Sequence, residues 1–288
     1  MKDYLSLIKF SHTIFAIPFA IIGFTLGVFD AKTGFDPDLF VKVILCMVFA
    51  RSAAMAFNRY LDRDIDKLNP RTSAREIPAG VIGEKNALLF TGLNVGLFVS
   101  VTYFINNVCF LLSPVALAFI LGYSYTKRFT SLCHVVLGIS LALAPVGAFL
   151  AVTGQFKVLP VLLGFVVMFW VSGFDIIYAL QDDIFDKSQK LHSIPVNVGR
   201  RKALLLSRVF HLASALILLY FVYLTVLSFP AFSNLLWIGY FLFISMLFYQ
   251  HTLVKENDLS RVGLAFFTFN GIASLLFGLV FIADAWLI

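Results

Sequence analysis

The chain has 288 residues, of which 60% are hydrophobic and 13% are charged, and its mean hydropathy is +0.92. A soluble domain has about 45–50% apolar and about 25% charged residues, so this composition excludes an ordinary soluble enzyme. The net charge of +6 is better explained by basic connecting segments than by a nucleic-acid partner, and we expect none. Cys46, Cys109 and Cys133 lack paired spacing, which favours small core residues over metal ligands or disulfides.

Nine apolar segments follow one another, most of them about 20 residues long and therefore able to cross a ~30 Å hydrocarbon layer. They cover residues 13–29, 39–57, 86–105, 109–125, 133–152, 159–180, 203–227, 232–252 and 262–284. The first lacks a small-residue cleavage site, so we interpret it as a span rather than a signal peptide. The sequence predicts an all-α polytopic membrane protein, with a single membrane domain over residues 1–288 and nine transmembrane helices.

The connecting segments differ in charge, which predicts the orientation. The amino-terminal end and the loops at 58–85, 126–132, 181–202 and 253–261 carry most of the 22 Lys and Arg residues. The opposite side has only Lys32, Lys42 and Lys157. Because positively charged loops stay in the cytoplasm, we expect a cytoplasmic amino terminus and an external carboxyl terminus.

Two acidic stripes stand at the cytoplasmic ends of predicted spans. The first acidic stripe, Asn58, Asp62 and Asp66, follows the second span. The second acidic stripe, Asp182 and Asp186, follows the sixth span. A four-residue step keeps side chains on nearly the same helical face, so each stripe predicts an oxygen-rich line on one helix.

The segments after the two stripes are weakly repeated. I-P-A-G-V-I-G-E-K-N-A-L (77–88) follows the first stripe, and I-P-V-N-V-G-R-R-K-A-L (194–204) follows the second. The even number of spans between the copies makes the repeat parallel, with a pseudo-axis along the membrane normal. The pattern predicts two four-helix repeats that place the stripes opposite each other across a central cavity.

The chemistry of the stripes favours a metal-bridged diphosphate. Hard oxygen ligands on two helices suit Mg²⁺, which completes its shell with phosphate oxygens and water. The interleaved basic side chains would suit a diphosphate, and they are Arg59, Arg63, Lys67, Arg71, Arg75, Lys127, Arg128, Lys187 and Lys190. The alternative is a solvated helix end with surface ion pairs. The five histidines show no ligand spacing, and tyrosines such as Tyr178 are also typical of an interfacial belt.

Arg51 lies within the second predicted span, seven residues or ~10 Å before Asn58. An arginine at that depth is costly, so we expect it to face the cavity and an anionic partner. The alternative is that Arg51 pairs internally, for instance with Asp175, and only stabilises the bundle.

Longer motifs carry a family resemblance. They are S-H-T-I-F-A-I-P-F-A (11–20), Y-S-Y-T-K-R-F-T (123–130) and L-A-P-V-G-A-F-L-A-V-T-G (143–154). With the two stripes, they resemble the UbiA superfamily of intramembrane aromatic prenyltransferases over nearly the whole chain. A-R-S-A-A-M-A-F-N-R (50–59) and H-S-I-P (192–195) are similar to the bacterial 4-hydroxybenzoate polyprenyltransferases. This branch implies ubiquinone biosynthesis at the bacterial inner membrane.

The resemblance implies that two Mg²⁺ ions hold the diphosphate of a polyprenyl donor between the stripes. The donor then forms an allylic cation, which an electron-rich aromatic ring attacks. The roles implied by position are metal ligands Asn58, Asp62, Asp66, Asp182 and Asp186; catalytic carboxylates Asp62, Asp66, Asp175 and Asp182; diphosphate-binding Arg71, Arg75, Lys127 and Arg128; and acceptor-binding Arg51 and Tyr178. One departure is Asp183, which leaves open which carboxylates of the second stripe bind metal.

Other functions remain open at this point. The nearest is another acceptor in the same superfamily, such as a dihydroxynaphthoate on the menaquinone route or homogentisate. CDP-alcohol phosphotransferases also carry two aspartate stripes, but their pattern needs D-G and A-R after the first aspartates, and D-R-D-I-D-K lacks it. A transporter usually places its charges near the midplane on broken helices, unlike these stripes. We expect membrane lipid and the two substrates as partners, and no obligate protein partner is evident.

Overall fold

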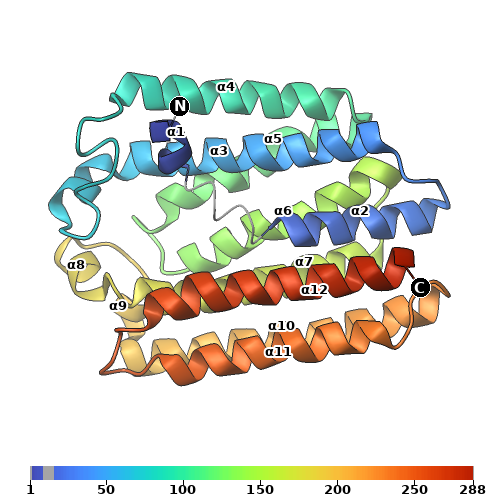
Figure 1. Cartoon of the computed structure of the whole chain (residues 1–288). Coiled ribbons are helices and arrows are strands. Elements are labelled where there is room, and N and C mark those ends of the chain that lie inside the picture. Colours follow the sequence, from blue (N-terminus) through green and yellow to red (C-terminus); the bar gives the residue numbers. More distant parts are fainter. Residues whose placement is uncertain (1, 9–15, 288) are drawn as a thin grey trace.

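A computed structural model describes residues 2–8 and 16–287, and these ranges are helical apart from turns and one isolated bridge between Lys255 and Asp258 (Figure 1). The elements are α1 (Lys2–Leu7), α2 (Ile17–Ala31), α3 (Pro37–Leu68), α4 (Glu84–Tyr103), α5 (Asn107–Thr126), α6 (Cys133–Thr153), α7 (Val158–Ala179), α8 (Asp183–Ser188), α9 (Ile194–Val198), α10 (Arg200–Ser228), α11 (Leu235–Leu253), the π-helical turn η2 (Leu264–Phe269) and α12 (Asn270–Leu287). The all-α prediction is confirmed.

Within the described ranges, eight helices are long and apolar enough to cross a membrane. They correspond to the second to ninth predicted segments, the last being η2 together with α12. The first predicted segment corresponds to α2, whose 15 residues extend only ~22 Å. Residues 13–15 of that segment, and with them much of the motif at 11–20, lie outside the described residues.

Helix α3 continues well beyond the predicted end of its span at residue 57. It starts at Asp36, whose carboxylate accepts hydrogen bonds from the backbone N–H groups of Asp38 and Leu39 at 3.0 and 3.2 Å. Neither glycine nor a further proline interrupts it before Asn69, the residue that precedes Pro70. Its 32 residues extend ~48 Å, so the first acidic stripe is an uninterrupted helical extension of a span.

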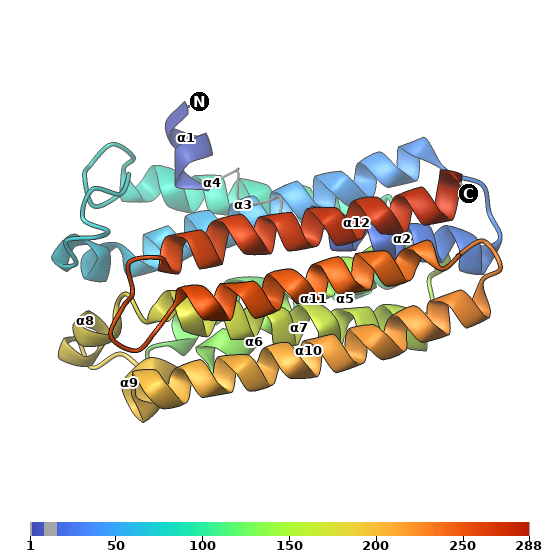
Figure 2. The same cartoon turned by 60° about the horizontal axis from the view of Figure 1, so that its bottom comes forward.

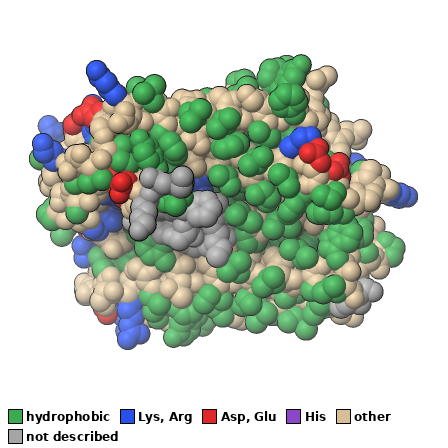
Figure 3. All heavy atoms as spheres, turned by 45° about the horizontal axis from the view of Figure 1, so that its top comes forward, with side chains coloured by type: hydrophobic (Ala, Val, Ile, Leu, Met, Phe, Trp, Pro, Cys, Tyr) green, Lys and Arg blue, Asp and Glu red, His purple; other side chains and the backbone are tan. Residues whose placement is uncertain are grey.

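The long helices run side by side, and their connections gather at two ends (Figures 1 and 2). The segments 69–83, 127–132, 180–199 and 254–263 lie at one end with α8 and α9, which we call the α8–α9 end. Lys and Arg side chains gather mainly at this end of the surface in Figure 3, and a broad hydrophobic band covers the middle. This pattern suits an integral multi-pass membrane protein.

The two copies of the predicted repeat fold alike. After each stripe the chain turns through a glycine in the left-handed region, Gly80 at φ 74° and Gly199 at φ 79°, where side chains other than glycine are strained. A long helix follows in each copy. Helix α4 packs against α3, which carries the first stripe, and α10 packs against α7, which ends just before the second stripe. The repeat therefore brings both acidic segments to the same end of the bundle.

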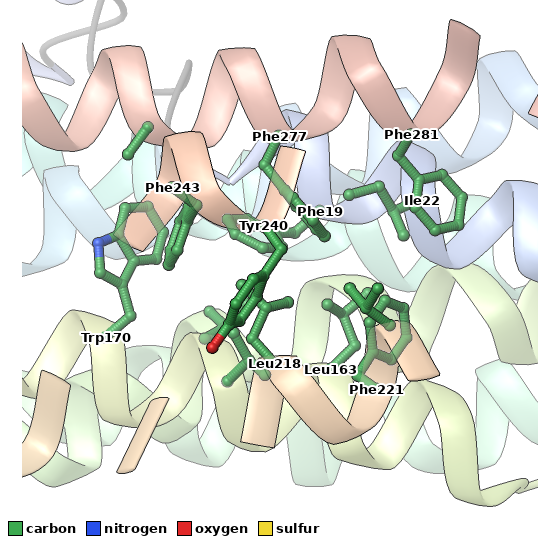
Figure 4. Close-up of a cluster of buried hydrophobic side chains, with 14 of the residues drawn as sticks. Phe19, Ile22, Leu163, Trp170, Leu218, Phe221, Tyr240, Phe243, Phe277 and Phe281 are labelled. Atoms are coloured by element: carbon green, nitrogen blue, oxygen red, sulfur yellow. The ribbon is translucent and has the colours of Figure 1, made fainter. Parts of the chain in front are cut away.

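The main hydrophobic core joins α2, α7, α10, α11 and α12 (Figure 4). Phe19 packs against Trp170, Phe243 and Phe277, with ring centroids 5.2–6.3 Å apart. The indole N–H of Trp170 donates to the Asn270 side chain at 2.9 Å, which satisfies a polar group deep in this core. This core holds α7, the helix that leads into the second stripe, against its neighbours.

Helix α2 approaches α6 so closely that only glycine fits at Gly23. A Cβ at this position would overlap the Pro145 carbonyl group. We expect Gly23→Ala to lower the free energy of unfolding by about 1–3 kcal/mol through overpacking. Gly96→Ala on α4 is the matched control, because no neighbouring atom of the described residues lies within 4 Å of its added Cβ. Thermal unfolding in detergent measures both, and equal melting temperatures would contradict the close α2–α6 contact.

Candidate active site

A cavity of about 1140 Å³ lies between α3, α5, α6 and α7. Along α3 its lining runs from Val43 to Asp66, a length of ~35 Å at ~1.5 Å per residue. Its wall is charged at the α8–α9 end and becomes apolar toward Met47, Phe98 and Ile105. The same cavity therefore offers a polar head and a long apolar channel.

The first acidic stripe lies in the charged part of this cavity, where Asp62 and Asp66 are buried. Asp62 forms ion pairs with Lys127 at 3.1 Å and Arg128 at 2.9 Å, both from the end of α5. Asp66 accepts two hydrogen bonds of 2.8 Å from Arg75 Nη1. Each carboxylate is thus held by cations from outside α3, which fixes where the stripe points.

The second acidic stripe reaches the same cavity from the end of α7. Asp182 accepts a hydrogen bond from Arg71 Nε at 2.9 Å and a second bond from the same guanidinium. The amide of Asn69 donates to it at 3.1 Å. The segment that follows the first stripe therefore binds the second stripe directly, as the predicted facing arrangement requires.

Asp186 and Asp183 differ in their surroundings. Asp186 lines the cavity, and burial, together with Asp182 and Asp62, raises the pKa of its carboxyl group to about 6, although Lys127 opposes the shift. Asp183 instead forms an ion pair with Arg200 at 2.6 Å and does not belong to the cavity lining. The geometry therefore favours Asp182 and Asp186 over Asp183 as the facing carboxylates of the second stripe.

The predicted diphosphate residues do not all face the cavity. Arg71, Arg75 and Lys127 line it. Arg128 pairs with Asp62 but does not line the cavity. It also donates to the carbonyl groups of Leu61 and Ser124, both at 3.0 Å. This position suits Arg128 to orienting Asp62 rather than to contacting a bound diphosphate.

Tyr178 lies beside Arg71 rather than beside Arg51. Its hydroxyl accepts a hydrogen bond from Arg71 Nη1 at 3.0 Å, and its ring stacks on Phe266 with centroids 4.1 Å apart. The Arg71 guanidinium carbon lies 5.3 Å from the ring centroid. Tyr178 is therefore placed to orient Arg71 at the polar head of the cavity.

Arg51 lines the cavity deeper in the bundle, and its side chain has no ion-pair or hydrogen-bond partner among the described residues. Its Nε atom is buried. The suggested internal partner, Asp175, instead contacts His134, with Oδ2 2.7 Å from Nδ1. The arrangement leaves the Arg51 cation available to an anion inside the cavity.

His134 is the residue of this site that the sequence did not single out. Its Nε2 accepts a hydrogen bond from the backbone N–H of Ile194 at 3.3 Å, so Nδ1 is the nitrogen that donates to Asp175 in the neutral ring. His134 is on α6, Asp175 is on α7 and Ile194 opens α9. No local spacing relates them, and only the fold brings them together.

The donor set fits Mg²⁺. Among the described residues, no group of three His, Cys, Asp or Glu side chains is already placed to hold a metal ion. Mg²⁺ does not need such a cage, because it commonly uses one or two carboxylates plus substrate phosphates and water. The oxygen side chains of Asn58, Asp62, Asp66, Asp182 and Asp186 all line the one cavity.

Comparison with known proteins identifies the family. A family model described as the UbiA prenyltransferase family matches residues 16–272. The chain belongs to the UbiA prenyltransferase family. Membership favours prenyl transfer over the phosphotransferase and transporter alternatives, and the chain is an integral multi-pass membrane protein.

Curated relatives are similar over most of this UbiA chain. A 4-hydroxybenzoate octaprenyltransferase from Nitrosomonas europaea is 30% identical over 247 residues, 84% of this chain and 81% of the relative. A protoheme IX farnesyltransferase from Rhodopseudomonas palustris is 34% identical over 174 residues, 59% of this chain and 54% of the relative.

Solved structures share the fold. A UbiA homologue from Aeropyrum pernix superposes with a TM-score of 0.80 at 27% identity, covering 95% of this chain and 96% of that one. A UbiA homologue from Archaeoglobus fulgidus, bound to DMAPP and Mg²⁺, gives a TM-score of 0.75 at 21% identity, covering 99% of this chain and 100% of that one. The expected UbiA fold is confirmed.

Proposed function

We propose that this protein transfers a polyprenyl group from a polyprenyl diphosphate to an aromatic acid, with 4-hydroxybenzoate as the favoured acceptor. The observation that carries the proposal is that one cavity brings together two facing acidic stripes, a long apolar wall and Arg51, which has no partner among the described residues. The relative from N. europaea supports the acceptor, and the A. fulgidus neighbour supports DMAPP-like donors and Mg²⁺.

The polar head of the cavity would bind the donor's diphosphate. Asn58, Asp62, Asp66, Asp182 and Asp186 would hold Mg²⁺, which when bound neutralises diphosphate charge and makes it a better leaving group. Three basic side chains line the same polar head, and they are Arg71, Arg75 and Lys127. They would stabilise the negative charge that develops on the diphosphate as it leaves. The apolar channel would take the polyprenyl chain, away from water.

The acceptor would lie between Arg51 and the polar head. Arg51 is seven residues before Asn58 on α3, a distance of ~10 Å along the axis, so a benzoate ring fits between them. Its guanidinium would bind the carboxylate bidentately and direct the ring carbon ortho to the hydroxyl toward the cation. Asp175, held by His134 and without a Lys or Arg partner among the described residues, is suited to accept the proton that the ring loses.

The direct test is product analysis with purified protein, Mg²⁺, geranyl diphosphate and each of three acceptors. We expect prenylated 4-hydroxybenzoate with its carboxyl group retained. Preferential prenylation of a dihydroxynaphthoate with loss of CO₂ would mean that this compound, not 4-hydroxybenzoate, is the acceptor. The protein would still be an aromatic prenyltransferase. No prenylated product from 4-hydroxybenzoate, a dihydroxynaphthoate or homogentisate would contradict the proposal.

We further propose that His134 positions Asp175. His134→Ala is expected to lower kcat by about 10–100-fold with little change in either KM, as for other residues that orient a functional group. His134→Gln should recover much of the activity, because an amide can donate to Asp175 and accept from the Ile194 N–H group. Equal losses in both variants, or parallel losses of kcat and melting temperature, would indicate a purely structural role.

The active site is proposed to open toward the cytoplasm, since the basic segments lie at the α8–α9 end. A reporter fused after Ile288 is then expected to be external, and one inserted in the 254–263 turn to be cytoplasmic. A cytoplasmic signal after Ile288 would contradict the number of spans or the orientation.

A further inference from the structure

A second cavity, of about 520 Å³, lies where α10 begins and α11 ends, two helices that run side by side in Figure 2. Its lining carries an excess of positive charge and includes Arg201, Arg208, His251, Thr252, Lys255 and Glu256. None of these residues lines the large cavity between α3 and α7. The second cavity is therefore separate from the candidate active site.

Its cations have no ion-pair partner in the described part of the chain. Arg201, Arg208 and Lys255 form no ion pair with any described residue, although Glu256 lines the same cavity. His251 donates or accepts through Nε2 to His211 at 2.8 Å, while its buried Nδ1 has no hydrogen-bond partner among the described residues. A ligand with anionic oxygens would pair with these cations, and its hydroxyl groups would bind His251 Nδ1.

An exposed strip of α10 shares a helix face with the two arginines of the cavity. Arg201, Leu205, Arg208 and Leu212 recur at helical spacing on one face of this helix. Leu205 is 58% exposed and Leu212 is 60% exposed. Arg208 is two turns or ~10 Å deeper than Arg201, so its charge approaches the hydrocarbon layer, where an unpaired cation is costly.

We propose that this cavity binds the phosphate headgroup of an anionic phospholipid, with an acyl chain lying along Leu205 and Leu212. Arg201 and Arg208 would contact the phosphate, Lys255 would add to the positive field, and His251 would bind a headgroup hydroxyl. A soluble phosphate shares the headgroup chemistry, but it gains nothing from the exposed leucines below the arginines. That difference favours the lipid, and it allows an experiment to distinguish a lipid headgroup from a soluble phosphate.

The test is lipid retention by the purified full chain, measured by native mass spectrometry with added phosphatidylglycerol or phosphatidylcholine. We expect wild-type protein to retain phosphatidylglycerol selectively. The double variant Arg201→Gln/Arg208→Gln should bind it about tenfold to thirtyfold more weakly, since each basic residue near the surface contributes about fivefold. The control Lys85→Gln/Lys202→Gln removes two exposed charges that do not line the cavity, and it should bind like wild type.

Two results would overturn the proposal. Equal retention by both double variants would show that net charge, not this cavity, attracts the lipid. Displacement of phosphatidylglycerol by millimolar inorganic phosphate or diphosphate would assign the cavity to a soluble anion. Neither readout depends on prenyl transfer. The proposed function can therefore be wrong while the lipid site is correct, and the lipid site can be wrong while the proposed function is correct.

Discussion

Asp182→Asn is expected to lower prenyl transfer by about 10²–10³-fold, because it removes a carboxylate that would hold the Mg²⁺ that stabilises the leaving diphosphate. Its matched control is Asp183→Asn, which makes the same chemical change one residue later. Asp183 is held by Arg200 outside the cavity lining, so its variant should keep near-normal activity. Similar losses in both variants, or near-normal activity of Asp182→Asn at saturating Mg²⁺, would contradict the assignment of the second stripe.

The two stripes should also depend on each other. Asp62→Asn is expected to cost as much activity as Asp182→Asn, and the double variant little more, because residues that act as a unit are not additive. Asp62 is buried between Lys127 and Arg128, so its replacement leaves two cations without their partner and should also lower the melting temperature. Asp182→Asn is therefore the cleaner test of chemistry, and Asp62→Asn tests the link between α3 and α5 as well.

Arg51→Lys is expected to raise the KM for 4-hydroxybenzoate about 10–100-fold and to leave the KM of the prenyl donor nearly unchanged. Lysine keeps the charge but loses the planar fork that binds a carboxylate through two hydrogen bonds. The variant should fold, because no described residue depends on Arg51 for an ion pair.

Phenol, which lacks the carboxylate, is the control acceptor for Arg51. Its slow prenylation should respond little to Arg51→Lys, since it cannot use the guanidinium. If both acceptors lose activity equally, Arg51 has a structural role. If the donor KM rises instead, Arg51 contacts the diphosphate, and the benzoate interpretation loses its main residue-level support.

Much of this site was predictable from local spacing. The four-residue steps of Asn58, Asp62 and Asp66 predicted a stripe on one helix face, and α3 carries them on its uninterrupted extension. The repeated Ile-Pro segments predicted that both stripes meet, and Asp182 does contact Arg71 and Asn69 beside the first stripe. Such features follow from helical geometry and chain direction, which the sequence specifies directly.

The remaining features depend on packing between distant segments. His134 and Asp175 are 41 residues apart, and the choice between Asp182 and Asp183 depends on Arg200 at the start of α10. The predicted span ended at residue 57 whereas α3 continues to Leu68, because hydropathy marks the membrane boundary and helix continuity depends on the absence of glycine and proline. Tertiary contacts of this kind have no periodic signature in the chain.

The central claim is that both acidic stripes bind one Mg²⁺-bridged diphosphate in the large cavity. Calorimetric binding of a non-hydrolysable geranyl diphosphate analogue tests it without turnover. We expect binding that requires Mg²⁺, is lost with a chelator, weakens at least about tenfold in Asp182→Asn and is unchanged in Asp183→Asn. Equal affinity with and without Mg²⁺, or in wild type and Asp182→Asn, would contradict the claim.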